Sequence, residues 1–542
     1  MLLAMAVRYT STRNSRVNAS IAEAIVQGMP QDGGLFVPEQ IPALPLVALN
    51  EPGLSYAELA WLVLAPWFDW SEDELRPLIE RAYTEQSASG GEALFDVPKI
   101  VPLKAAGSLG NHPLFLLELF HGKTCAFKDL ALSLLGKLLQ KSLEKCGIDE
   151  PLLILTATSG DTGSAALAGL GGQPGIRIAV IYPAEGTSEI QRLQMTSVPI
   201  EARLVIGLRG NFDDAQRAVK RIFQNAGNPD SPFHAIRLSS ANSINIGRLL
   251  PQIVYYVKAW RELYFSGSLR QGEPFDVVVP SGNFGDILAA RYAKAMGLPI
   301  GKLVCASNSN RILYDFFRTG VYDRRRKFSK TLSPSMDILV SSNLERLLYH
   351  VLDENPELVA MTMQKFEREG FFELPEKNRA TIADFRAGWA DDARTLEIIR
   401  SMWETHGMLV DPHTAVACKV ARDVYAKGTE ASGAAVSSRA TIVSKAAATD
   451  SAPVVIAATA SPFKFPAACL EALRGRKDPT SEKGKDLQLA FELSRLTGLP
   501  VPKPIVALLS AKINHGTIID ESDLERVLTE FAQQETGTAR IL

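Results

Sequence analysis

Short runs of aliphatic and β-branched residues, each followed by a small-residue turn and a helix-like segment, recur along the chain from about residue 150 onward. The runs lie at 152–156, 177–181, 202–206, 235–238, 276–279, 303–306 and 454–458. Strands that alternate with helices predict parallel sheets in a layered α/β fold. Ligands bind to such sheets outside the carboxyl ends of the strands, where the helices begin. We therefore expect the functional residues directly after these runs.

Composition excludes several other classes of protein. The chain has 542 residues, which is enough for two to four domains at about 150 residues each. Its 58 Lys and Arg residues against 60 Asp and Glu residues give a formal net charge of −2, so the positive charge of a general nucleic-acid-binding protein is absent. The basic run at 324–327 is interpreted as a solvated loop. No apolar run reaches the roughly 18 residues that cross a bilayer.

The cysteines and the start of the chain indicate the compartment. The 5 cysteines, at 125, 146, 305, 418 and 469, are scattered without the spacing of a metal site. Reduced thiols and no metal are therefore expected. The first residues are apolar, but the apolar stretch is too short for a secretion signal, so we expect a cytoplasmic protein.

The first hundred residues have a different pattern. After a short first strand, residues 1–98 are expected to be mainly helical, because apolar residues recur at helical spacing over 56–66 and 73–84. Ser71 and Glu74 have the spacing of a capping box. Residues 87–92 are rich in Ser and Gly, as is typical of a linker, and would separate this region from the rest.

Two turns are suited to binding anions. The first, at 156–163, lies between a strand-like run and the helix-like residues 164–170, and the second, at 280–286, precedes a helix-like segment at 287–295. Amide groups and hydroxyls at a helix start attract a carboxylate or a phosphate. Neither turn has the spacing of a dinucleotide site or of a nucleotide-binding P-loop. The alternative for each is a plain strand-to-helix connection with a capping side chain.

Lys128 is the candidate catalytic residue. It follows Ala126 and Phe127 and precedes an apolar helix-like segment at 130–139. A desolvated lysine loses its charge readily and becomes a nucleophilic amine, as a Schiff base with an aldehyde requires. The alternative is an ordinary ion pair between Lys128 and the adjacent Asp129.

Two further segments carry polar residues beside apolar ones. Thr459 follows the strand-like run at 454–458, where its hydroxyl is able to hydrogen-bond a ligand, although threonine is also common in strands. Asp411 and Pro412 have the pattern of an N-cap and the first residue of a helix. This pattern explains both residues without catalysis and leaves the role of His413 open.

Together these motifs closely resemble those of threonine synthases, which are pyridoxal-phosphate enzymes with the tryptophan-synthase-β-like fold (fold type II). The similar segments, collinear over almost the whole chain, are 9–13, 30–34, 121–129, 159–163, 242–248, 281–286, 335–338, 342–346 and 411–415. The long N-terminal region is similar to that of the larger form found in fungi and many bacteria. Departures from the family pattern occur at Lys123, Cys125 and residues 461–463.

The resemblance implies an α/β protein with two parallel-sheet layered domains and a mainly helical N-terminal domain. The expected domains are residues 1–98, a small α/β domain at 131–269, and a large cofactor-binding domain formed by 99–130 and 270–542. Residues 428–451, rich in Ala, Ser and Thr, are expected to be a surface insertion, with an Ala-rich helix as the alternative.

The resemblance also implies an activity, the conversion of O-phospho-L-homoserine and water into L-threonine and phosphate, with pyridoxal 5′-phosphate as cofactor. Lys128 is then the catalytic residue and is bound to the cofactor. The other implied cofactor-binding residues are Gly282, Asn283, Phe284, Gly285, Asp286 and Thr459. The implied substrate-binding residues are Ser159, Gly160, Asp161, Thr162, Gly163, Asn242, Asn245 and Arg248.

Arg248 is the candidate for binding the substrate phosphate, because a guanidinium forms bidentate contacts with oxyanions. Lys123 and Lys464 are secondary candidates, and a surface ion pair is the alternative for Arg248. The expected partner is this small substrate, without nucleic acid or membrane, in a monomer or homodimer. Two other functions fit the same fold: a phospholyase or dehydratase giving 2-oxobutyrate, and a non-catalytic binding module. Asp161 favours threonine synthase over a dehydratase, in which asparagine is expected there.

Overall fold

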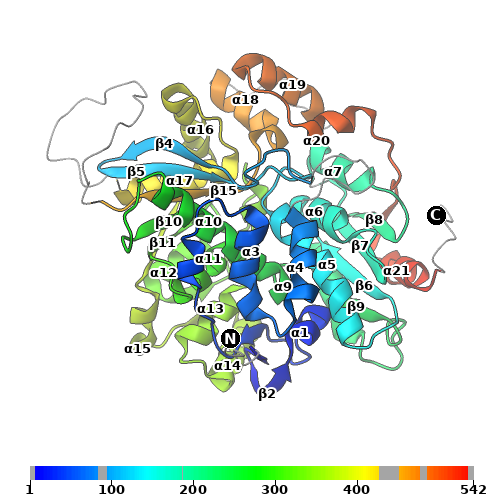
Figure 1. Ribbon diagram of the computed structural model, residues 1–542. Coiled ribbons are helices and arrows are strands. Elements are labelled where there is room, and N and C mark those ends of the chain that lie inside the picture. The colour runs from blue at the N-terminus through cyan, green and yellow to red at the C-terminus, as the bar shows by residue number, and fades with distance from the viewer. Residues whose placement is uncertain are drawn as a thin grey trace.

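Two helix-flanked sheets and an N-terminal region make up the protein (Figure 1). The computed structural model describes residues 7–83, 94–185, 187–210, 212–425, 451–475 and 485–534. The linker expected at 87–92 and the insertion expected at 428–451 lie outside the described residues, apart from Ser451.

The smaller sheet has five parallel strands in the order β16-β8-β7-β6-β9. Leu152 and Ile154 of β6 belong to the core that contains α5 and α6, whereas Leu153 and Leu155 belong to the core shared with α8 and α21. Burial on both faces explains why β6 and β7 are almost entirely apolar, with Thr156 and Arg177 as the exceptions. The four strands predicted in this region are confirmed as β6 (Leu152–Ala157), β7 (Ile176–Pro183), β8 (Arg203–Leu208) and β9 (Arg237–Ser239).

The larger sheet has six strands in the order β14-β11-β10-β15-β5-β4, all parallel except β4, which runs antiparallel to β5. The three predicted strands are confirmed as β10 (Phe275–Pro280), β11 (Ile300–Ser307) and β15 (Val454–Ala458). The sequence did not predict the hairpin β4 (Leu103–Leu109) and β5 (His112–Glu118) or the edge strand β14 (Phe385–Trp389).

Helices follow the strands as the sequence predicts. The helices that carry functional residues or cover the sheets are α5 (Lys128–Lys145), α6 (Asp161–Leu170), α7 (Glu189–Thr196), α8 (Phe212–Asn225), α9 (Ile246–Leu249), α10 (Pro251–Phe265), α11 (Gly285–Ala295), α12 (Ile312–Thr319), α13 (Leu344–Val351), α14 (Pro356–Glu369), α16 (Asp392–His406), α17 (Pro412–Tyr425), α18 (Pro466–Arg474) and α19 (Asp486–Thr497). Asp411 caps α17, since its carboxylate accepts hydrogen bonds from the amides of His413 and Thr414. The predicted N-cap is therefore confirmed.

The N-terminal region contains more β-structure than the one strand expected. A three-stranded antiparallel sheet, β2-β1-β3, precedes the helices. Its strands are β1 (Tyr9–Ser11), β2 (Asn14–Ala19) and β3 (Phe36–Pro38), and the main helices are α1 (Ile21–Gln27), α3 (Tyr56–Leu64) and α4 (Glu72–Tyr83). The amide of Ser71 donates to the Glu74 carboxylate at 2.9 Å, as the capping-box spacing predicts.

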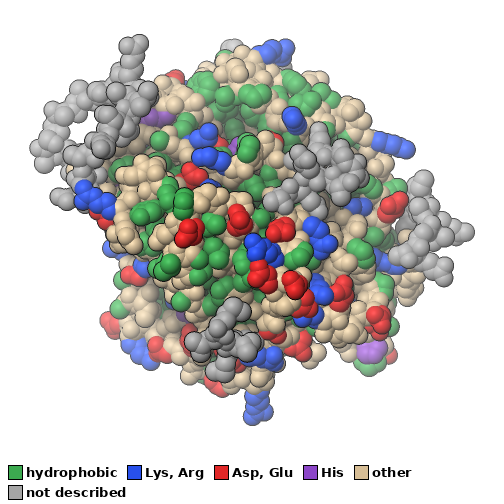
Figure 2. Space-filling model, in the orientation of Figure 1, with side chains coloured by type: hydrophobic (Ala, Val, Ile, Leu, Met, Phe, Trp, Pro, Cys, Tyr) green, Lys and Arg blue, Asp and Glu red, His purple; other side chains and the backbone are tan. Residues whose placement is uncertain are grey.

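Acidic and basic side chains are intermingled on the face where α3 and α4 lie (Figure 2). Between neighbouring helices they form ion pairs, such as Lys145 of α5 with Glu74 of α4 at 2.8 Å. Among the described helices, none is both long enough and apolar enough to span a membrane.

The C-terminal residues lie with the small sheet, whereas the sequence assigned all of 270–542 to the large domain. Strand β16 (Ile518–Ile519) pairs with β8, and α21 (Leu524–Gln533) packs on the same side of the small sheet as α8. The strand has only two residues, so its sequence carries no periodicity that would reveal its partner.

Candidate active site

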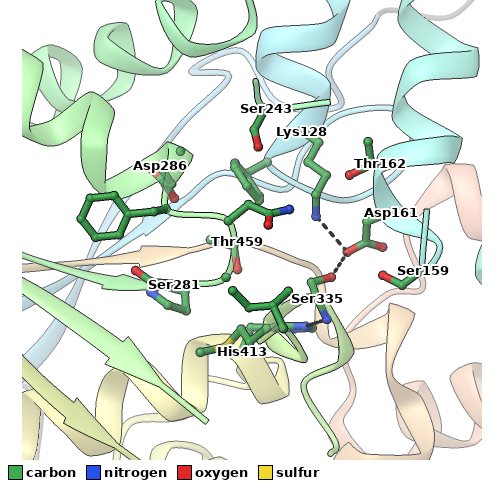
Figure 3. A pocket seen from close by; sticks show the side chains of 18 of the residues that line it. Lys128, Ser159, Asp161, Thr162, Ser243, Ser281, Asp286, Ser335, His413 and Thr459 are labelled. Carbon is green, nitrogen blue, oxygen red and sulfur yellow. Dashed lines mark hydrogen bonds and ion pairs between the residues drawn. The ribbon is translucent and has the colours of Figure 1, made fainter. Parts of the chain in front are cut away.

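Residues directly after strands of both sheets line one pocket. It encloses about 1070 Å³ of empty space, including its opening to solvent. The first sheet contributes residues that follow β6, and the second contributes residues that follow β10 and β15 (Figure 3). Helix α9, helix α17 and the segment 334–338 complete the wall. The predicted anion-binding turns therefore face one common space.

Lys128 is the first residue of α5 and its side chain is buried at the pocket. Its Nζ lies 3.4 Å from Oδ2 of Asp161 and 4.9 Å from the ring centre of Phe127. Burial lowers the pKa of Lys128, and although Asp161 opposes this shift, the nearby positive charge of Arg248 reinforces it. The buried amine therefore has the environment that nucleophilic chemistry requires.

The alternative ion pair between Lys128 and Asp129 is wrong. Asp129 accepts hydrogen bonds from the amide and the hydroxyl of Thr124, at 2.8 and 2.7 Å, and so stabilises the loop before the helix. Successive residues of a helix point in different directions, which is why adjacency in sequence does not bring these two side chains together.

Three hydrogen-bond donors and one further ammonium group contact Asp161, on two sides. Its Oδ2, on the pocket side, accepts from Lys128 and from Ser335 Oγ at 2.9 Å. Its Oδ1 accepts from Gln191 Nε2 and pairs with Lys464 Nζ, both at 2.8 Å. Burial alone would raise the pKa of Asp161, but the Lys464 and Lys128 ammonium groups outweigh it and hold that pKa well below its ordinary value.

The turn at 280–286 presents backbone amides to the pocket. Phe284 has a left-handed backbone with φ of 63°, and α11 begins at the next residue. After Ser281, the next amide that donates to a main-chain carbonyl is that of Leu288, which bonds to Phe284. The amides from Gly282 to Gly285 therefore have no main-chain acceptor among the described residues. Four uncommitted amides at a helix N-terminus form a site for an anion such as phosphate.

Contacts from the segment 341–343 fix this turn. Ser341 Oγ donates to the Gly282 carbonyl at 2.8 Å, and the Asn343 side chain donates to the Asn283 carbonyl at 3.0 Å. A Cβ atom added to Gly282 would lie 2.6 Å from the Ser335 carbonyl oxygen, so only glycine allows this approach.

Asp286, the second residue of α11, lines the pocket but binds tyrosines. Its Oδ1 accepts hydrogen bonds from the hydroxyls of Tyr255 and Tyr256, while its Oδ2 is buried and has no hydrogen-bond partner among the described residues. Burial outweighs the two tyrosine hydrogen bonds and raises the pKa of Asp286 to about 6.

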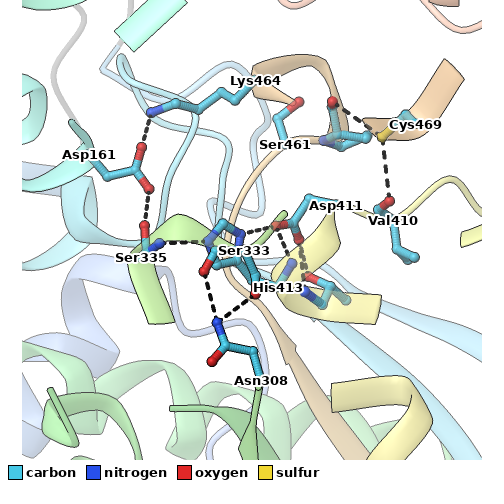
Figure 4. A network of polar contacts seen from close by, with 12 residues as sticks. Asp161, Asn308, Ser333, Ser335, Val410, Asp411, His413, Ser461, Lys464 and Cys469 are labelled. Atoms are coloured by element: carbon cyan, nitrogen blue, oxygen red, sulfur yellow. Dashed lines mark hydrogen bonds and ion pairs between the residues drawn. The ribbon is translucent and has the colours of Figure 1, made fainter. Parts of the chain in front are cut away.

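His413 connects the capping carboxylate of α17 to the pocket. Its Nδ1 lies 2.6 Å from Asp411, and its Nε2 accepts a hydrogen bond from the Ser335 amide at 3.1 Å (Figure 4). Because Nε2 is an acceptor, Nδ1 carries the hydrogen and donates to Asp411. The sequence left the role of His413 open; the structure places it as the residue that holds Ser335 against Asp161.

Arg248 is buried and lines the pocket, so the alternative of a surface ion pair is wrong. Its Nη1 donates to the Ala241 carbonyl at 2.7 Å. No carboxylate in the described part of the chain forms an ion pair with it, and burial lowers its pKa to about 10, so it is still charged at neutral pH. A buried guanidinium without a counter-ion is suited to an anionic ligand.

The loop before Lys128 has its own ion pair and an unreactive thiol. His121 lies 3.1 Å from Asp96 and 2.9 Å from Glu118, and these contacts outweigh burial and raise its pKa to about 9. Burial raises the pKa of the Cys125 thiol to about 12, so this departure from the family pattern adds no nucleophile.

The pocket brings together most of the predicted site residues, but not all. Those that line it are Lys128, Ser159, Asp161, Thr162, Asn242, Arg248, Gly282, Asn283, Phe284, Gly285, Asp286 and Thr459. Gly160, Gly163 and Asn245 lie behind the wall; Asn245 caps α9 by accepting from the Gly247 amide and donates to the Ile25 carbonyl. Of the secondary candidates, Lys123 is exposed and Lys464 is buried behind Asp161.

Several pocket residues were not predicted from the sequence. They are Ser243, Gln252, Ser335 and Met336, together with Gln191 in the layer behind. Ser243 and Ser335 lie in segments whose sequences resemble those of the family, and this resemblance was the available signal that they belong to the site. Gln191 carries no such signal, because its side chain is the N3 partner in the capping box of α7.

Comparison with known proteins finds a matching family model for each of two parts of the chain. Residues 8–83 match the family described as threonine synthase N terminus, and residues 97–372 match that of pyridoxal-phosphate-dependent enzymes. Threonine synthase-like 1 of Macaca fascicularis is 38% identical over 84% of this chain, which spans 58% of that protein. Threonine synthase of Schizosaccharomyces pombe is 39% identical over 76% of this chain and 82% of that protein. The structure of pyridoxal-phosphate-bound threonine synthase from Brucella melitensis has a TM-score of 0.79 at 32% identity, covering 98% of this chain and 100% of that one.

Proposed function

We propose a function on the basis of family membership and pocket geometry together. The chain belongs to the threonine synthase family of pyridoxal-phosphate-dependent enzymes. We propose that it acts in the cytoplasm and converts O-phospho-L-homoserine and water into L-threonine and phosphate. The observation that carries this proposal is that one pocket contains a buried amine, that of Lys128, between two separate sites for anions, the amides at 282–285 and the guanidinium of Arg248.

The residues present fit the cofactor of this family. An aldehyde with a phosphate group needs an amine to bind and a cradle for the phosphate. Lys128 provides the amine, and the turn provides four amides that have no main-chain acceptor in the described part of the chain and a glycine at which an added Cβ would clash with the opposite wall. Thr459 lines the same pocket and is the candidate partner for the pyridine nitrogen. When bound, pyridoxal phosphate stabilises negative charge at the substrate carbons next to the amino group.

The chain's own residues account for the proton transfers. Lys128 would remove the proton from Cα and return a proton at the end, and it would also act as the base for the proton that leaves Cβ. Phosphate leaves Cγ, which receives a proton, and the hydroxyl of water adds to Cβ while its hydrogen leaves with the phosphate. Asp161 contacts the Lys128 amine at 3.4 Å and would orient it toward the pocket. The protons and oxygen atoms of substrate and product then balance.

Arg248 is proposed to bind the substrate phosphate. A guanidinium binds two oxyanion oxygens at once, and its charge stabilises the leaving group. The turn at 159–162 would bind the substrate carboxylate through hydroxyls and amides at the start of α6. The carboxylate of Asp161 would repel that group, so we assign Asp161 to Lys128 instead.

Product analysis tests this function. The purified chain with pyridoxal phosphate is incubated with O-phospho-L-homoserine, and the products are identified by chromatography and a phosphate assay, with Lys128→Ala as control. Equal amounts of threonine and phosphate are expected. Release of 2-oxobutyrate and ammonia with the phosphate would replace the proposal with a phospholyase, and bound cofactor without any product would indicate a binding module.

Family membership does not determine the oligomeric state or the absence of nucleic-acid binding. We propose that the chain acts on this small molecule as a monomer or homodimer, without nucleic acid. Light scattering of the purified chain measures its oligomeric state, and a larger assembly would contradict this prediction.

A further inference from the structure

Lys464 lies outside the pocket wall yet contacts its central carboxylate. It belongs to the short turn η5 (Pro462–Lys464), which follows Thr459 along the chain. Its side chain is 0% exposed, and its Nζ lies 2.8 Å from Oδ1 of Asp161 (Figure 4). The Nζ has no hydrogen-bonding partner of good geometry among the described residues. This buried ammonium therefore depends on Asp161 for its stabilisation.

The Asp161 carboxylate does not need Lys464 for its orientation. Gln191 already donates to Oδ1, and Ser335 and Lys128 already contact Oδ2. What Lys464 adds is charge. A buried ion pair is costly to form and contributes little stability on average, so a second buried cation on one carboxylate calls for another explanation.

Charge balance provides that explanation. If Lys128 were the only cation beside Asp161, the loss of its proton would leave a buried carboxylate without a counter-ion, which is strongly unfavourable. With Lys464 in place, Lys128 loses its proton and an intact ion pair remains. The cofactor role proposed above consumes Lys128 as a free amine, so this arrangement removes the electrostatic obstacle to it.

We propose that Lys464 is a positioning residue: it is the permanent counter-ion of Asp161, and it thereby lets Lys128 present an uncharged amine to the pocket. The inference rests on the proposed cofactor role of Lys128. It does not depend on which product the enzyme forms.

The groups that face Lys128 come from several elements and agree with this assignment. They are Asp161 of α6, Arg248 of α9, Asp286 of α11 and Lys464 of η5. His413 of α17 faces Asp161 from the other side, through Ser335. Burial lowers the pKa of Lys128, Asp161 opposes this, and the positive charges of Arg248 and Lys464 reinforce it. Removal of Lys464 should therefore make Lys128 harder to deprotonate.

Chemical labelling of Lys128 tests the inference without turnover. The full-length chain, freed of cofactor with hydroxylamine, is labelled with trace acetic anhydride at a series of pH values, and peptide mass spectrometry gives the pH midpoint for Lys128. In Lys464→Met the midpoint is expected to rise by about one pH unit or more, with labelling at pH 7 about tenfold lower. Lys464→Arg should keep the wild-type midpoint, and Asp161→Asn should lower it.

The controls separate a specific effect from a loss of folding. Lys419→Met, which removes a partly exposed lysine paired with Asp423 at 2.6 Å, should leave the midpoint unchanged. If thermal denaturation shows that Lys464→Met is unfolded, Lys464→Gln keeps a donor to Asp161 without the charge and should show the same rise. A folded uncharged variant with the wild-type midpoint would overturn the inference. Failure of wild-type protein to form threonine, with the labelling shifts present, would overturn the proposed reaction alone.

Discussion

Replacement of Gly282 by alanine tests whether the turn at 281–286 depends on close backbone contact. The added Cβ atom would lie 2.6 Å from the Ser335 carbonyl oxygen, about 0.8 Å inside the ordinary contact distance of 3.4 Å. Ser335 cannot move freely, because His413 and Asp161 hold it with hydrogen bonds of 3.1 and 2.9 Å. The φ of Gly282 is not positive, so alanine suits the backbone and only the contact is at issue.

We expect this steric contact to weaken the binding of pyridoxal phosphate. Overpacking of a fixed wall costs about 1–3 kcal/mol. Ser341 and Asn343 hold the carbonyls of this turn, but its amides have no main-chain acceptor among the described residues, so the contact is relieved by a shift of the turn that strains those two hydrogen bonds while the anchored segment at 335 stays in place. The amides then no longer converge on the phosphate. We expect the dissociation constant of pyridoxal phosphate to rise by roughly 5- to 150-fold, because each 1.4 kcal/mol is tenfold.

Titration of cofactor-free protein with pyridoxal phosphate, followed by absorbance, measures this change. Thermal denaturation of the same samples shows whether the fold is retained. Gly227→Ala is the matched control, because an added Cβ there meets nothing within 4 Å and the φ is not positive. Unchanged affinity in Gly282→Ala, or an equal loss in the control, would refute the reasoning.

Three further variants test other parts of the structure. His121→Gln should remove a pH-dependent contribution to the free energy of unfolding. The two carboxylate partners of His121 raise its pKa to about 9. The stability that it adds is therefore fully present below pH 6.5 and disappears as the pH rises through about 9. Urea unfolding at pH 7 and at pH 10 should therefore differ more in wild type than in the variant; an equal difference would contradict this. Arg346→Met should lower the free energy of unfolding by at least about 2 kcal/mol. The reason is that this fully buried guanidinium donates to the carbonyls of Phe36, Ser243 and Ile244. A loss of stability no greater than that caused by Arg394→Met, at an exposed arginine, would be inconsistent with this role. Arg248→Ala should raise the KM for O-phospho-L-homoserine at least tenfold with cofactor affinity retained, and a parallel loss of cofactor would place Arg248 at the wrong phosphate.

The sequence predicts the parallel strands because their local pattern is a direct result of burial. Every residue of β6 and of β10 is buried, and apart from Thr156 and Asp276 each strand is an apolar run. Strand β4 has only one buried residue, and β14 contains Gly388 and is mostly partly exposed, so neither has that pattern. The pairing of β16 with β8 joins residues about 310 positions apart, and no local signal specifies such a contact.

In the candidate site, too, some features could be predicted from the sequence and others are seen only in the folded chain. The turns at 156–163 and 280–286 were each predicted to bind an anion, because both follow strands, whereas only the folded chain shows that they face one pocket. Asn245 looked like a site residue, but its short side chain caps α9 instead. The contacts of Asp161 with Gln191, Ser335 and Lys464 join four separate segments, so only the folded chain reveals that its carboxylate lies between two lysines.

The covalent attachment site of the cofactor is the most direct test of this account. The chain is loaded with pyridoxal phosphate, reduced with sodium borohydride, digested, and mapped by mass spectrometry. We expect the reduced cofactor on the peptide that contains Lys128, and on no other lysine in stoichiometric amount. Attachment at Lys123 or Lys464 with Lys128 unmodified would contradict it.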